Sequence, residues 1–68
     1  MYSIVLVYSK FQNIKDLIEK ISKLNGDVIL AKDIERGLGF LSFNNVQIFA
    51  IDSSYKLNET DLIKLQNI

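Results

Sequence analysis

The chain contains no cysteine, no histidine and no proline. The first two absences exclude disulfide frameworks, the usual zinc sites, thiol nucleophiles and histidine-based acid–base catalysis. Eight Lys and Arg residues balance eight Asp and Glu residues, so the net charge is zero. We expect no nucleic-acid partner, because binding phosphates needs a basic excess. No apolar run approaches the roughly 18 residues of a membrane-spanning helix, so we expect a cytoplasmic protein with no membrane partner.

The composition predicts a single small globular domain over residues 1–68. Hydrophobic residues make up 49% of the 68 positions, which is enough apolar surface to form one core but not two. A domain of this size buries only about 60% of the surface that its unfolded chain exposes, so its stability is marginal.

Three apolar segments predict strands. Ile4–Val7 is a continuous β-branched-rich run, as is typical of a central parallel strand that is covered on both faces. The second segment is Asp27–Ala31, and the third is Val46–Ile51, which ends at Asp52. Asn44-Asn45 precedes the third segment and predicts a break in the chain.

The region between the first two strands predicts an amphipathic helix. Ser9 and Gln12 have capping-box spacing and indicate a start near Lys10, whereas Asn13 with Asp16 would start the helix one turn later. The apolar residues then recur at helical spacing: Ile14, Leu17, Ile18, Ile21 and Leu24. Asn25-Gly26 predicts the end of the helix, with the glycine in the left-handed conformation.

Two further helices are predicted from their caps. Asp33 precedes a short helix over 34–41, and Asn58 precedes a last helix with Asp61 at its third position. An alternative makes Phe40–Phe43 a strand that turns at Asn44-Asn45 into Val46–Ile51 as a hairpin. We favour the helix.

Residues 27–41 resemble the second strand, turn and second helix of the receiver domain of two-component response regulators. Gly37 stands where that family has a small alanine, and Leu38 and Phe40-Leu41 stand at its apolar helix positions. Val46–Asp52 resembles the third strand, whose last residue is the phosphoacceptor aspartate. The resemblance covers most of the chain and implies the N-terminal half of a receiver domain.

The expected fold class is therefore α/β, a truncated flavodoxin-like or receiver-like β-α-β-α-β-α chain. Right-handed crossovers give its three-stranded parallel sheet the order 2-1-3. The alternative is an α+β fold with the hairpin at 40–51.

The departures from the receiver pattern argue against an active phosphoacceptor. Receivers place an acidic pair after the first strand to hold Mg²⁺, but Tyr8 and Ser9 stand there, and Asp52 remains alone. We therefore expect no enzyme activity, no metal, no cofactor and an inactive Asp52. In an alternative, Asp52 is phosphorylated with help from a partner's groups. Lysines near the carboxyl ends of the strands suggest an anion site, although solvated side chains are the simpler interpretation: Lys10, Lys32 and Lys56.

Strand order 2-1-3 leaves the third strand at an edge, without proline, inward lysine or bulge-forming glycine to protect it. We therefore expect a homodimer, or docking onto a protein partner or other domains of a longer chain. The predicted interface residues are Ile14, Leu17, Ile18, Ile21, Ile48, Phe49 and Ile51. The expected function is that of an atypical, phosphorylation-independent receiver-like regulatory and dimerisation module. By family resemblance it would be the N-terminal domain of a bacterial transcription activator. The alternative is a stand-alone protein-binding or inhibitor module of phage or plasmid type.

Overall fold

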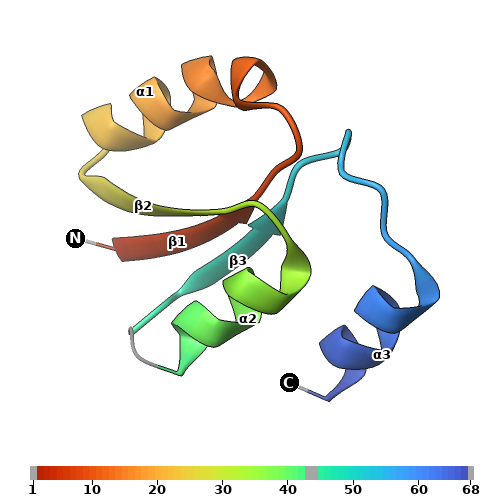
Figure 1. Ribbon diagram of the computed structural model, residues 1–68. Helices are drawn as coiled ribbons and strands as arrows, with labels where there is room; N and C mark the ends of the chain where they lie inside the picture. The colour runs from red at the N-terminus through yellow and green to blue at the C-terminus, as the bar shows by residue number, and fades with distance from the viewer. Residues whose placement is uncertain (1, 43–44, 68) are drawn as a thin grey trace.

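The computed structural model describes residues 2–42 and 45–67 and contains one three-stranded parallel sheet with helices on both faces (Figure 1). The elements in chain order are β1 (Tyr2–Val7), a 3₁₀ turn (Phe11–Asn13), α1 (Lys15–Lys23), β2 (Gly26–Ala31), α2 (Ile34–Leu41), β3 (Ile48–Ile51) and α3 (Glu59–Gln66). The sheet has the order β2-β1-β3, so the predicted α/β class, parallel pairing and strand order are confirmed.

The central strand is β1, which pairs in parallel with β2 along Tyr2–Val7 and with β3 along Ile4–Val7. Residues Ile4–Val7 are buried, which explains why their apolar run is continuous. The third strand begins at Ile48 rather than at the predicted Val46. Before it, the Ser3 N–H donates to the Gln47 side-chain oxygen at 2.7 Å, and the Gln47 N–H donates to the Ser3 carbonyl at 3.1 Å.

Of the two predicted starts of the first helix, the one near Lys10 is wrong and the later one, after Asn13, lies within one residue of the observed start, although Asn13 does not cap it. The chain first makes the 3₁₀ turn Phe11–Asn13 and enters α1 only at Lys15, and neither start has a side-chain cap. Ser9 therefore caps no helix. Its Oγ instead lies 3.3 Å from the Oγ of Ser54, on the loop after β3.

The glycine prediction at the end of α1 is also wrong. Asn25, with φ 62°, takes the left-handed conformation, and Gly26 already begins β2. A Cβ on Gly26 would collide with the Ile21 side chain and lie 3.0 Å from the Tyr2 ring. This position therefore needs glycine for the close approach of its neighbours.

The caps of the other two helices are confirmed. The Arg36 N–H donates to Asp33 Oδ1 at 2.8 Å at the start of α2. At the start of α3, the Asp61 N–H donates to Asn58 Oδ1 at 2.8 Å, and the Asn58 N–H donates to Asp61 Oδ2 at 3.2 Å. These reciprocal bonds form a capping box and satisfy two main-chain donors.

The hairpin alternative for residues 40–51 is wrong. Phe40 and Leu41 belong to α2, and β3 runs parallel to β1 rather than pairing with the segment before it. Phe43 and Asn44 lie outside the described residues. Part of the hairpin alternative and part of the predicted chain break fell on these two residues.

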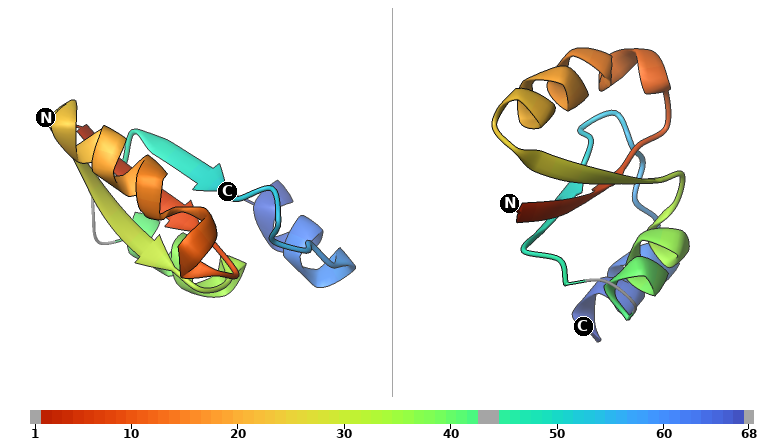
Figure 2. Two further views of the ribbon diagram at one scale, coloured as in Figure 1. Left: turned by 90° about the horizontal axis from the view of Figure 1, so that it is seen from above. Right: turned by 90° about the vertical axis from the view of Figure 1, so that its left-hand side faces the viewer.

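The sheet separates two packed layers, with α1 on one face and α2 with α3 on the other (Figure 2). Val5, Val7, Ala31 and Ile34 form the buried centre of the α2 face. Because successive strand residues point to opposite faces, Ile4 and Leu6 of β1 point towards α1. Within residues 2–42 and 45–67, no helix has the length and apolar character needed to cross a membrane.

Candidate functional site

The outer side of β3 is an open sheet edge. The Asp52 N–H donates to the Val7 carbonyl at 2.8 Å, and in a parallel ladder alternate residues face the neighbouring strand. The main-chain groups of Phe49 and Ile51 therefore point away from β1. Seen from above, α3 lies beside α2 and past the end of β3 rather than along its outer side (Figure 2). In the described part of the chain, no other strand pairs with this edge.

Exposed apolar side chains lie beside the open edge. Ile14, the residue just before α1, is 1% exposed and anchors the start of the helix against the domain. A helix turns about 100° per residue, so Leu17 lies about 40° to one side of the half-buried Ile21, and Leu24, the residue after α1, lies on the same side. The right-handed connection from β1 through α1 to β2 directs that side of the helix towards β3.

Ile48 completes this surface from the sheet. It pairs with Ile4, and paired residues of neighbouring strands share a face, so Ile48 lies on the α1 face. The exposed fractions are 46% for Leu17, 68% for Leu24 and 46% for Ile48. We call these three residues the α1–β3 patch.

The structure does not bring the predicted interface residues together on one surface. Leu17 and Ile48 are exposed on the α1 face, Ile18 and Ile21 are half-buried, and Ile14 is buried inside the domain. Phe49 and Ile51 pack against the core of the α2 face. Leu24 was absent from the prediction, although its place in the apolar stripe was visible in the sequence.

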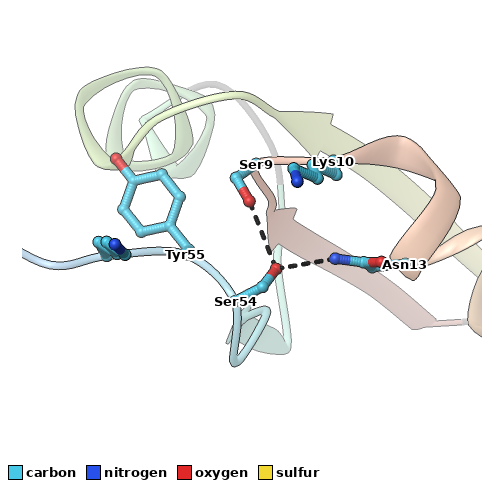
Figure 3. A pocket seen from close by; sticks show the side chains of 6 residues that line it. Ser9, Lys10, Asn13, Ser54 and Tyr55 are labelled. Carbon is cyan, nitrogen blue, oxygen red and sulfur yellow. Dashed lines mark hydrogen bonds between the residues drawn. The ribbon is translucent and has the colours of Figure 1, made fainter.

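A second feature is a polar cleft of about 520 Å³, formed by the loops that follow β1 and β3 (Figure 3). Ligands of open α/β sheets bind at this end of the strands. The lining residues are Ser9, Lys10, Asn13, Ser54, Tyr55 and Lys56. The cleft thus brings together two of the lysines singled out from the sequence, whereas Lys32 is not among its lining residues.

Hydrogen bonds join the two loops of the cleft. Asn13 Nδ2 donates to Ser54 Oγ at 3.2 Å, and the Ser54 hydroxyl in turn donates to the Asp52 carboxylate. The Tyr55 hydroxyl accepts the Ile34 N–H at 3.3 Å, which ties the loop after β3 to the start of α2. The partners in these hydrogen bonds between loops are far apart in the sequence, so no local sequence pattern predicts the contacts.

Asp52 is half-buried at the end of β3 and does not line the cleft. Tyr8, at one of the positions where receivers carry an acid, packs edge-on against Phe11 with ring centroids 6.4 Å apart. Among residues 2–42 and 45–67, no three His, Cys, Asp or Glu side chains gather in a group able to hold a metal ion.

No family model, curated protein or solved structure matches the chain. The likeness to receiver domains therefore depends on the residue pattern alone.

Proposed function

We propose that this chain is a non-catalytic regulatory module that acts by self-association through the open edge of β3. The observation that carries the proposal is the edge itself, because Phe49 and Ile51 offer main-chain donors and acceptors to a further strand. The strand sequence Ile48–Ile51 has no charge that would oppose a second copy. The chain as a whole is neutral as well.

A twofold axis at Ala50 would satisfy the edge. In an antiparallel pair centred there, Phe49 of each copy lies opposite Ile51 of the other, and both residues present outward main-chain groups. The two Ala50 residues would face each other as a close, non-hydrogen-bonded pair, which a small side chain allows. Such an isologous contact closes on itself.

The exposed area of the chain supports association. The surface measures 4958 Å², whereas a monomer of 7.8 kDa exposes roughly 4400 Å² by the scaling of monomeric proteins. A standard interface buries about 800 Å² on each partner. The surface area above the monomer value is thus a substantial part of the area that one partner buries in an interface. The α1–β3 patch lies next to the strand edge that would form this interface.

The test is sedimentation of the full chain over a range of micromolar concentrations. We expect a reversible dimer for the native chain and a 7.8 kDa monomer for Ile48→Lys, because lysine at a strand edge blocks further pairing. Ile63→Lys is the matched control. Ile63 is 59% exposed on α3, on the other face of the sheet, so this variant should still dimerise.

A native chain that stays monomeric at every concentration would contradict the proposal. Equal loss of assembly in Ile48→Lys and Ile63→Lys would contradict the choice of surface. Circular dichroism of each variant separates loss of assembly from loss of fold.

We further propose, from the resemblance to receiver domains, that the module is a degenerate receiver that works in the cytoplasm without phosphorylation. By the same resemblance it would be the N-terminal domain of a bacterial transcription activator. Incubation with acetyl phosphate and Mg²⁺, followed by intact mass measurement, tests the phosphorylation part. We expect no added phosphate. A Mg²⁺-dependent gain that disappears in Asp52→Asn would establish Asp52 as a phosphoacceptor instead.

The alternative of a stand-alone inhibitor module was tied to the hairpin at 40–51, which the fold lacks. No other feature of the described residues supports this alternative. We therefore prefer the regulatory module.

A further inference from the structure

The polar cleft has an excess of positive charge. Lys10 comes from the loop after β1 and Lys56 from the loop after β3, and both line the cleft. Across the described residues, the ion pairs are Arg36–Asp33 at 3.8 Å and Lys64–Glu35 at 3.6 Å, so neither cleft lysine has a carboxylate partner. The two ammonium groups are exposed and outnumber the single carboxylate of Asp52 behind Ser54, so the hollow has a local excess of positive charge on a neutral chain.

The hydrogen bonds inside the cleft occupy the proton and both lone pairs of Ser54. Ser54 donates its proton to Asp52, so it accepts from Asn13, and Ser9, at 3.3 Å, must be the donor to it. Ser54 is thereby saturated. Donors remain on the two ammonium groups and on the second N–H of the Asn13 amide, and acceptor lone pairs remain on the Ser9 hydroxyl oxygen and on Asn13 Oδ1.

This balance selects the sign of a ligand. A divalent cation would meet two ammonium groups, and the Asp52 carboxylate behind Ser54 does not line the cleft and already accepts the Ser54 hydroxyl. An oxyanion would instead accept hydrogen bonds from both lysines and from Asn13, and charge-assisted bonds of this kind are the stronger ones. The Tyr55 ring, held by its bond to Ile34, gives the cleft an apolar wall.

We infer that this cleft, built by Lys10, Asn13 and Lys56, binds a phosphate group non-covalently and without a metal ion. Inorganic phosphate and a phosphate monoester share this chemistry. The Tyr55 wall favours a monoester with a flat organic group, such as phenyl phosphate. The inference does not depend on the proposed dimer, because its residues lie outside both the β3 edge and the α1–β3 patch.

The test is an NMR titration of the ¹⁵N-labelled chain at fixed pH and ionic strength, once with inorganic phosphate and once with phenyl phosphate. We expect saturable shifts in the backbone amides of residues 9–13 and 53–56, with tighter binding of phenyl phosphate. Lys10→Gln and Lys56→Gln should each weaken binding about threefold, and the double variant about tenfold. Lys32→Gln, an exposed lysine outside the cleft, is the matched control and should bind like the native chain.

Non-saturating shifts spread over all lysines, equally affected by Lys32→Gln, would mean an adventitious ion only and would overturn the inference. Saturable shifts with Mg²⁺ alone at these residues would overturn it in favour of a cation site. Unchanged amide shifts in β1 and α2 establish that each variant keeps its fold. Equal affinity for the two probes would assign the site to free phosphate and remove the role of the Tyr55 wall.

Discussion

The two faces of the sheet differ in how completely they are covered. On the α2 face, Val5, Val7 and Ile34 are fully buried, and α3 adds Leu65 to the packing around them. On the α1 face, Ile4 and Leu6 of β1 are buried, whereas Ile48 of β3 remains 46% exposed.

The difference follows from the order of the strands. The connection from β1 to β2 places α1 over those two strands, whereas the connection from β2 to β3 carries α2 across the whole sheet. The third strand therefore has cover on one face only. A domain of three parallel strands inherits this asymmetry from its topology, whatever residues it contains.

The largest effect is expected from Ile34 at the centre of the covered face. Ile34 is 0% exposed, so Ile34→Ala should lower the free energy of unfolding by about 2–5 kcal/mol through lost burial and the cavity left behind. Leu17→Ala, at a 46% exposed position of the other face, should cost under about 1 kcal/mol. Urea denaturation measures both.

If Ile34→Ala does not fold, Ile34→Val keeps the comparison measurable, with an expected loss of about 0.5–1.5 kcal/mol. A cost for Leu17→Ala as large as that for Ile34→Ala would mean that the two faces are equally covered.

Two glycines of α2 sharpen the comparison within one helix. A Cβ on Gly37 would lie 2.9 Å from Val7 Cγ2 and 3.1 Å from the Phe49 ring, so Gly37→Ala should cost about 1–3 kcal/mol by overpacking. Gly39 faces open space, and Gly39→Ala should stabilise the chain by up to about 1 kcal/mol through helix propensity. Thermal unfolding of the two variants should shift in opposite directions. A shift in the same direction would contradict the packing of α2 on the sheet.

The smallest effect concerns the helix starts. Asn58→Ala removes the side-chain acceptor of the α3 capping box and should cost about 1 kcal/mol. Ser9→Ala removes a side chain that caps no helix, and it should cost less than Asn58→Ala in the same denaturation experiment. The reverse ranking would restore Ser9 as a cap.

The sequence predicted those parts of the fold that depend on neighbours along the chain. The Ile4–Val7 run indicated the central strand, and Asp33 and Asn58 marked helix starts because a cap bonds only three residues away. Ser9 misled because its partner, Ser54, belongs to another loop. Gly26 misled because the space around it, and not its backbone angle, requires glycine.

The candidate site was predicted only in part. The open edge followed from strand order, and Lys10 with Lys56 followed from their places after strands. The division of the predicted interface residues between the two faces of the sheet could not be predicted, because the face on which a strand residue lies depends on its register with β1. The bond from Ile34 to the Tyr55 hydroxyl, which fixes one wall of the cleft, has no local pattern at all.

The short length of β3 limits how far pairing at its open edge can extend. The strand is four residues long, and just before it the Gln47 side-chain oxygen accepts the Ser3 N–H. An edge strand of four residues allows an incoming strand only a few pairing registers. It also offers few main-chain hydrogen bonds for the repeated strand stacking that forms fibrils. The four-residue edge therefore restricts the registers in which a further strand can pair with β3.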